Sequence, residues 1–112
     1  MTLDELYSKG TASALKKLVG GQQEQAAIDD GVRVYFEWAD GSVMKVDAFA
    51  DRVHFLTLRS QREGLYSDLC DTLPEFFKDR GVERFTASPR DGESEAILRK
   101  RGGWDDDMSW EL

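Results

Sequence analysis

Cysteine and histidine are almost absent from this chain of 112 residues, which contains one of each. The single cysteine, Cys70, cannot form a disulfide within the chain, as is typical of proteins from a reducing compartment. One cysteine and one histidine also cannot supply the cluster of ligands that a structural zinc ion requires. We therefore expect a cytoplasmic protein without a metal site.

Long apolar runs and an excess of basic residues are lacking as well. No stretch is apolar over the roughly 20 residues that a membrane-spanning helix needs, and the first ten residues lack the apolar core of a signal peptide. The net charge of -7 argues against a general nucleic-acid-binding surface, which must be basic. We expect neither a membrane nor a nucleic-acid partner, whereas a cationic amine or peptide is compatible with this charge.

The composition is that of a folded domain. The hydrophobic fraction of 40% and the charged fraction of 33% are typical of a globular chain, and 112 residues suffice for one hydrophobic core. The sequence contains no internal repeat and no low-complexity segment. Residues 1–112 are therefore expected to form a single domain.

The first thirty residues predict helices. Thr2 and Glu5 have the spacing of a capping box, and Thr11 can cap a second helix that ends at Gly20 and Gly21. Residues 22–30 are polar and fit either a further helical turn or a loop. We therefore predict that residues 1–30 form an N-terminal helical region that covers one face of a sheet.

Three strands are predicted next, over residues 32–58. Apolar and polar residues alternate from Val32 to Trp38, and an Asp-Gly pair typical of a tight hairpin turn leads into a returning strand over residues 43–49. Residues 53–58 are apolar on both faces with two exceptions, which predicts a central strand. These residues thus predict an antiparallel three-strand meander.

The segment after the meander predicts an amphipathic helix. Leucine and phenylalanine residues recur at helical spacing from Leu65 to about Asp79. Pro74 lies inside this stretch and lacks the N–H of one helical hydrogen bond. We expect it to kink or split the helix, with Thr72 capping the second half.

The last third of the chain predicts a strand over residues 83–88, a helix over 93–101 and a final strand over 108–112. The strand–helix–strand crossover from Val53 to Ser88 should be parallel and right-handed. The predicted fold class is therefore α+β, or mixed α/β, with a central mixed sheet, an antiparallel meander, one crossover and flanking helices.

A polar loop that bears a glycine joins the strand over residues 53–58 to the helix beginning at Leu65. The first backbone N–H groups of a helix have no partners within it, and the helix dipole favours negative charge there. Arg59 and Arg62 add positive charge, and Gly64 allows the backbone to approach a ligand closely. This segment therefore predicts an anion-binding site.

The same loop, from Gln61 to Tyr66, resembles the pyrophosphate-binding motif of the GCN5-related N-acetyltransferases, the GNAT superfamily. The family pattern is Gln or Arg, two residues, Gly, one residue, and then Gly or Ala. Gln61 and Gly64 match this pattern, whereas Tyr66 stands where the family has a small residue. Gly103-Trp104 is similar to the Gly-Phe pair that precedes the family's last strand. The resemblance covers residues 32–112.

The resemblance implies a minimal, partly degenerate GNAT domain, with the meander over residues 32–58 and the cofactor loop, helix, strand, helix and strand over 59–112. It also implies an acetyl-CoA-dependent N-acyltransferase that transfers an acyl group directly to a primary amine of a small molecule or a protein. The cofactor-binding residues that it implies end the third strand and form the loop: Thr57, Leu58, Arg59, Gln61, Arg62, Glu63, Gly64, Leu65 and Tyr66.

Two departures from the family pattern leave a second function open. No strand before Val32 resembles the family's first strand, and the tyrosine that often protonates the leaving thiolate would fall at Leu98 or Arg99. The alternative is a catalytically inactive GNAT-like module that binds or inhibits another protein. The final strand over residues 108–112 would also offer an edge for a homodimer.

Two side chains are candidates for the general base of such a transfer. Glu37 lies on the polar face of a predicted strand, and His54 is the residue whose ordinary pKa is nearest to neutrality. Each has a plainer interpretation, as a solvated carboxylate and as a core or edge histidine. Tyr35 and Tyr66 are candidate proton donors to the thiolate, and Tyr66 could instead pack in the core or block the pyrophosphate site.

Overall fold

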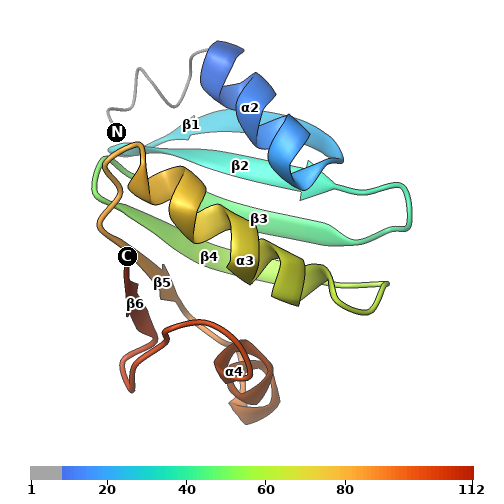
Figure 1. Cartoon of the computed structure of the whole chain (residues 1–112), viewed down its shortest axis with the longest axis vertical. Coiled ribbons are helices and arrows are strands. Elements are labelled where there is room, and N and C mark those ends of the chain that lie inside the picture. The colour runs from blue at the N-terminus through green and yellow to red at the C-terminus, as the bar shows by residue number, and fades with distance from the viewer. Residues whose placement is uncertain (1–8) are drawn as a thin grey trace.

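The computed structural model describes residues 9–112 as an α+β fold with one six-stranded sheet (Figure 1). None of the helices in this part of the chain has the length and hydropathy of a membrane-spanning segment. The helix predicted from Thr2 and Glu5 lies outside the described residues. The elements in chain order are α2 (Lys9–Val19), β1 (Gln22–Ile28), β2 (Gly31–Glu37), β3 (Val43–Ala48), β4 (Arg52–Arg59), α3 (Leu65–Lys78), β5 (Arg84–Ala87), α4 (Gly92–Arg99) and β6 (Ser109–Glu111).

The strands follow one another in the sheet in the order of the sequence, from β1 to β6. All neighbouring strands are antiparallel except β4 and β5, which are parallel and are connected through α3. A parallel connection needs a crossover of this kind, because the chain must return to the end of the sheet at which β4 began. The predicted parallel crossover is therefore confirmed.

Residues 22–28 form β1, so the prediction of a helical turn or loop over residues 22–30 is wrong. The meander consequently has four strands rather than three. On the helix-covered face, Gln23 lies opposite Phe36 and Gln25 opposite Val34. Because glutamine occupies the inward positions of this strand, the apolar alternation that reveals a half-buried strand is absent from its sequence.

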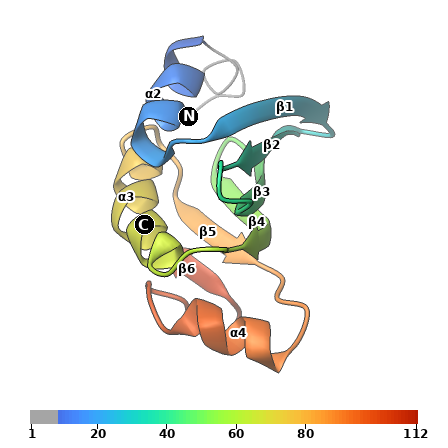
Figure 2. The same cartoon turned by 90° about the vertical axis from the view of Figure 1, so that its right-hand side faces the viewer.

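The hydrophobic core lies between one face of the sheet and helices α2 and α3, which lie on the same side of the strands (Figure 2). The apolar positions of β2 point into it, and Val32, Val34 and Phe36 are almost fully buried. The opposite face of β2–β4 carries polar side chains. There Arg33 donates two hydrogen bonds to the carboxylate of Asp47, at 2.8 and 3.1 Å.

Helix α3 is continuous from Leu65 to Lys78 through Pro74, so the prediction of a split helix is wrong. The hydroxyl of Thr72 does not cap a second helix but donates to the carbonyl of Asp68, four residues earlier, at 2.8 Å. The helix buries the side chains Leu65, Leu69, Leu73, Phe76 and Phe77. This burial on both sides of the proline offsets the one backbone hydrogen bond that Pro74 cannot make.

Replacing Gln23 by methionine is predicted to stabilise the fold. Both polar atoms of the Gln23 amide are buried without a hydrogen-bond partner, and an unsatisfied buried polar group costs about 1–3 kcal/mol. We expect Gln23→Met to raise the free energy of unfolding by about 1 kcal/mol in urea denaturation. Gln22→Met, on the exposed face of the same strand, is the matched control and should change it by less than about 0.5 kcal/mol. A lower free energy of unfolding for Gln23→Met would contradict this assignment.

Candidate functional site

Strands β4 and β5 are paired over only part of their length. The pairs run from Arg52 with Arg84 to Phe55 with Ala87, whereas β4 continues to Arg59. Beyond Phe55, the edge of β4 that faces β5 has no strand partner in the described part of the chain. The two strands therefore form a fork, with Leu56 as the first residue of one arm and Ser88 as the first residue of the other.

Strand β4 is irregular at the same point. Against β3, Phe55 pairs with Val46 and Thr57 pairs with Lys45, so Leu56 is an extra residue without a partner. Such a β-bulge bends the strand and increases its local twist. The bulge turns β4 away from β5 at the apex of the fork, and residues 56–59 present unpaired backbone N–H and C=O groups to the gap.

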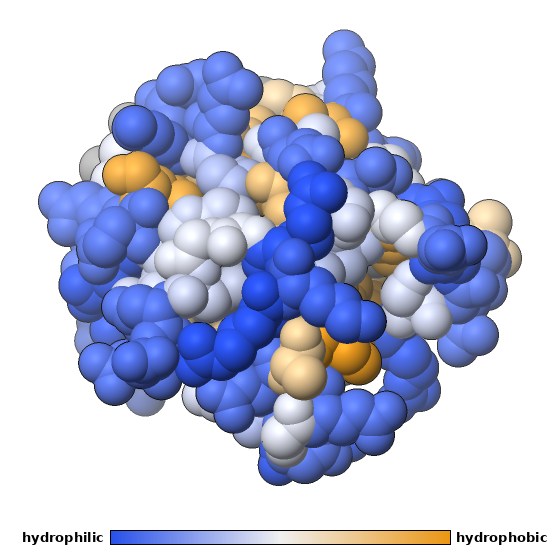
Figure 3. All heavy atoms as spheres, turned by 60° about the horizontal axis from the view of Figure 1, so that its bottom comes forward, coloured by the Kyte–Doolittle hydropathy of each residue, from blue (hydrophilic) through white to orange (hydrophobic). Residues whose placement is uncertain are grey.

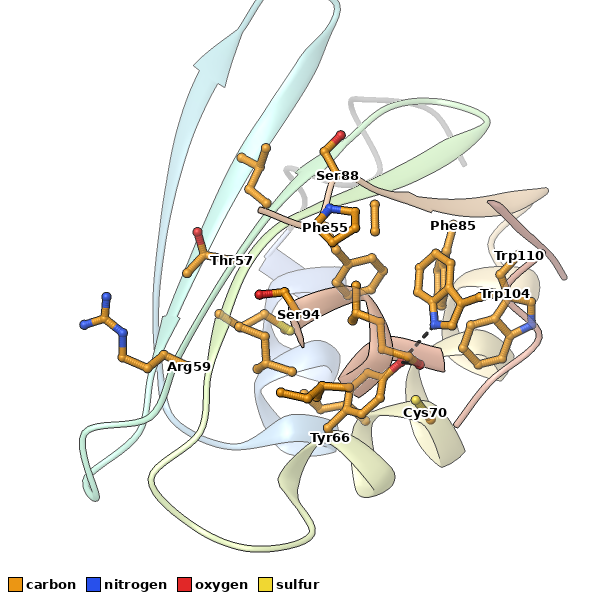
Figure 4. Close-up of a pocket in the computed structure, with 18 of the residues that line it drawn as sticks. Phe55, Thr57, Arg59, Tyr66, Cys70, Phe85, Ser88, Ser94, Trp104 and Trp110 are labelled. Carbon is orange, nitrogen blue, oxygen red and sulfur yellow. Dashed lines mark hydrogen bonds between the residues drawn. The ribbon is translucent and has the colours of Figure 1, made fainter. Parts of the chain in front are cut away.

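A cavity of about 240 Å³ lies in this fork. Its walls come from β4, α3, α4 and the segment between β5 and α4, and one end is aromatic, with Phe85, Trp104 and Trp110 close together (Figure 4). The ring centroids of Trp104 and Trp110 are 5.6 Å apart in an edge-on arrangement. Seen from the side of the molecule that comes forward in Figure 3, hydrophobic residues appear only as small separate patches on a mostly hydrophilic surface.

The charge of the cavity lining is opposite to that of the chain. The described residues that line it include two arginines, Arg59 and Arg90, and no aspartate or glutamate, although the net charge of the chain is -7. Arg59 is exposed and forms no ion pair within residues 9–112, and its side chain lies far from the aromatic end (Figure 4). A lining of this kind favours an anionic ligand with an apolar part.

The N-terminus of α3 opens beside the cavity. Its N-cap is Gly64, with a φ of 84° in the left-handed region, and no side chain caps the helix. A side chain at Gly64 would meet no atom within 4 Å, so the backbone here is accessible. The first N–H groups of the helix, from Leu65 onwards, are therefore available to an anion.

Gln61 and Arg62, in the same loop, form their contacts outside the cavity. The backbone N–H of Gln61 donates to the hydroxyl of the buried Ser42 at 2.9 Å. The Nε atom of Arg62 lies 3.6 Å from a carboxylate oxygen of Asp40, and its guanidinium faces the ring of Trp38. Arg62 therefore points towards the turn between β2 and β3 rather than into the cavity.

The structure brings together only part of the predicted cofactor set. The residues of that set that line the cavity are Thr57, Leu58, Arg59 and Tyr66. Leu65 is buried in the core, and Gln61, Arg62, Glu63 and Gly64 lie outside the lining. Glu37, a predicted general base, lines a different hollow on the surface together with Trp38 and Arg62.

Tyr66 connects the first turn of α3 to the last turn of α4 and to Trp104 in the segment that follows α4. Its hydroxyl donates to the carbonyl oxygen of Leu98 at 2.6 Å and accepts from the indole Nε1 of Trp104 at 2.8 Å (Figure 4). Burial raises the pKa of Tyr66 well above its ordinary value, and burial likewise raises the pKa of the neighbouring Cys70 thiol. Both groups are therefore neutral parts of the cavity wall near pH 7.

His54, the other predicted general base, reaches the cavity through a serine. Its Nδ1 atom lies 2.7 Å from Oγ1 of Thr86, and its Nε2 atom lies 3.3 Å from Oγ of Ser88, which lines the cavity. Burial lowers the pKa of His54, and the nearby Arg52 lowers it further, whereas Asp47 raises it. The net effect is a lowered pKa, so the imidazole is uncharged at neutral pH.

Sequence reasoning missed Ser88 and the aromatic end of the cavity. A usable signal existed for Ser88, because it follows β5 directly and the carboxyl ends of neighbouring parallel strands meet at one edge of a sheet. Trp104 and Trp110 carried no such signal, since an isolated tryptophan is usually a packing residue.

Comparison of the chain with protein-family models, with curated proteins and with solved structures returns no match. Within residues 9–112, no three histidine, cysteine, aspartate or glutamate side chains converge as a metal site would require. The interpretation of the site therefore depends on its geometry and its charge.

Tyr66→Phe is predicted to destabilise the protein. The substitution leaves the part-buried indole N–H of Trp104 without its acceptor, and one unsatisfied group of this kind costs about 1–3 kcal/mol. We expect the free energy of unfolding in urea to fall by about 1–3 kcal/mol. The matched control is Tyr35→Phe, because the Tyr35 hydroxyl has no hydrogen-bond partner in the described part of the chain. Equal effects of the two substitutions would show that Tyr66 does not fasten the wall.

The same tyrosine predicts a pH dependence. The pKa of Tyr66 in the folded protein is raised above its ordinary value of 10.0, so the unfolded chain releases this proton first. The contribution of the neutral phenol to stability is therefore complete below about pH 10 and is lost as the pH rises further. The difference in urea midpoint between wild type and Tyr66→Phe should shrink between about pH 9 and pH 11. A constant difference over this interval would argue against a buried, neutral Tyr66.

Proposed function

We propose that this chain binds an acyl-CoA, with acetyl-CoA as the simplest case, in the fork between β4 and β5 and transfers the acyl group to a primary amine. One observation carries the proposal: the bulge at Leu56 coincides with the end of the β4–β5 pairing, beside the cavity. The described residues that line this cavity include arginines but no aspartate or glutamate. An open strand edge, an apolar cavity and a helix N-terminus that could bind an anion lie close together here, which supports the function that the GNAT resemblance of the loop implies.

Each part of the fork matches one part of such a ligand. The unpaired edge of β4 at Thr57 and Leu58 can hydrogen-bond the amide groups of a pantetheine arm as an added strand would. The N-terminus of α3 and Arg59 can hold the pyrophosphate, because both offer positive charge and N–H donors. Backbone N–H groups at the bulge can stabilise the negative charge that develops on the thioester oxygen.

The chemical step would be a direct transfer. The uncharged amine attacks the thioester carbonyl carbon, the new C–N bond forms as the C–S bond breaks, and the CoA thiolate leaves. The amine nitrogen loses one proton in the same process. The apolar wall that Phe55, Phe85 and Trp104 contribute would limit the access of water, which competes with the amine for the thioester.

A second function is favoured by a specific observation. No carboxylate of the described chain lines the cavity, Glu37 lies at another hollow, and the proton of the Tyr66 hydroxyl is bonded to Leu98. The alternative is a catalytically inactive module that binds acyl-CoA or another protein at the same fork. Release of free CoA thiol from acetyl-CoA in the presence of a panel of primary amines separates the enzyme from this alternative.

Calorimetric titration with acetyl-CoA tests the binding site. We expect micromolar affinity that weakens as salt is added, and Arg59→Glu should weaken it at least about tenfold, because a lost hydrogen bond to a charged group costs about 1.5–3 kcal/mol. Lys17→Glu, an exposed residue on α2, changes the net charge equally and should leave the affinity within about threefold.

Two results would count against this site. Equal losses in Arg59→Glu and Lys17→Glu would mean that the chain attracts acetyl-CoA only through its overall charge. No binding by the wild type at millimolar acetyl-CoA would remove the acyl-CoA proposal and would direct the search towards a protein partner.

A further inference from the structure

Ser88 occupies the apex of the fork opposite the bulge. The last pair of β4 and β5 is Phe55 with Ala87, so Leu56 and Ser88 are the first residues on the two diverging arms. Ser88 lines the cavity on the β5 side of the gap, and its hydroxyl is turned away from the aromatic end of the cavity (Figure 4). A group that reaches the bulge from the His54 face of the sheet would therefore have the Ser88 hydroxyl as its neighbour at the apex of the fork.

The imidazole of His54 lies next to this hydroxyl, and each of its ring nitrogens faces a hydroxyl group. Its two ring nitrogens face two hydroxyls of the β5 arm, Nδ1 at 2.7 Å from Thr86 and Nε2 at 3.3 Å from Ser88. His54 and Thr86 are also register partners in the sheet, which fixes the ring beside β5. A neutral imidazole has one N–H and one lone pair, so the two hydroxyls cannot both receive a proton from it.

We propose that Ser88 and His54 form a proton relay at the apex of the fork, with Thr86 as the residue that positions the imidazole; this inference rests on the proposed acyl transfer. Nδ1–H of His54 donates to Oγ1 of Thr86, which leaves the lone pair of Nε2 free to accept from the Ser88 hydroxyl. The attacking amine gives one proton to Oγ of Ser88 while the serine proton passes to Nε2. The C–N bond forms and the C–S bond breaks in the same step, and the imidazolium later returns its proton to solvent.

The charged groups around the imidazole are compatible with this role. Asp47 on β3 faces it as its register partner but is already bonded to Arg33 on β2. Arg52 precedes it on β4, and Arg84 lies on the same face of β5 as Thr86. Burial and Arg52 lower the pKa of His54 and outweigh Asp47, which raises it, so the imidazole is uncharged and can accept a proton near pH 7.

The tautomer of His54 is the first test, and it does not require an acceptor. The chain has one histidine, so its ring nitrogens give a single set of signals in a two-dimensional nitrogen NMR spectrum. We expect the proton on Nδ1 at neutral pH in the wild type and in Thr86→Ser, and a redistribution towards Nε2 in Thr86→Val. A proton on Nε2 in the wild type would reverse the direction of the relay and overturn it.

The second test measures turnover and binding on the same variants. The probe reaction is the release of CoA thiol from acetyl-CoA, with benzylamine as acceptor and with water alone. Ser88→Ala and His54→Gln should each lower the rate by about 100-fold, because a positioned general base contributes about 10²–10⁴-fold. Calorimetric affinity for acetyl-CoA should stay within about threefold of the wild type, since neither side chain holds the CoA.

Ser109→Ala is the matched control, because Ser109 is the register partner of Thr86 on β6 and lies outside the cavity lining. Its rate should equal that of the wild type. If wild type, Ser88→Ala and His54→Gln release CoA thiol at the same rate, the relay is overturned, whether or not that rate exceeds the uncatalysed rate. Equal rates together with tight binding of acetyl-CoA by the wild type remove the relay alone, whereas absent binding removes the proposed function itself.

Discussion

The short parallel pairing of β4 with β5 is the constraint on which the rest of the site depends. It ends at Phe55 and Ala87, and the bulge at Leu56 turns β4 away just beyond that pair. Because parallel strands need a crossover, α3 must begin where β4 ends, which places its uncapped N-terminus at the mouth of the gap. The open strand edge, the helix N-terminus and the exposed Arg59 thus come together as consequences of one topological feature.

A gap between two strands would close if nothing held its outer wall. Here the wall is the chain from α4 to β6, and Tyr66 joins it to α3 through hydrogen bonds to Leu98 and Trp104. Trp110 lies so close to the backbone that a side chain at Gly103 would meet its ring nitrogen at 2.8 Å. The absence of side chains at Gly102 and Gly103 therefore allows the ring of Trp110 to pack against this turn, which holds the aromatic end of the cavity in place.

Sequence patterns predicted the elements whose apolar residues recur with a clear period, namely β2 to β5 and α3. They missed β1, because Gln23 and Gln25 occupy its inward positions and remove the alternation. Among the loop residues, charge alone could not separate Arg59, which lines the cavity, from Arg62, which is paired with Asp40. That difference depends on a contact between Arg62 and a turn 22 residues earlier in the chain, which no local pattern contains.

The two faces of the sheet differ in chemical character, which bears on the proposed transfer reaction. The face covered by α3 holds the apolar and aromatic part of the cavity, whereas the opposite face carries the polar row that contains Asp47, His54 and Arg59. At the fork the strands part, and Ser88 both lines the cavity and lies with its hydroxyl 3.3 Å from Nε2 of His54. In the proposed transfer, an anionic acyl donor on one face and an amine on the other would therefore meet at this apex. The bulge that opens the fork thus also determines where a reaction between them would occur.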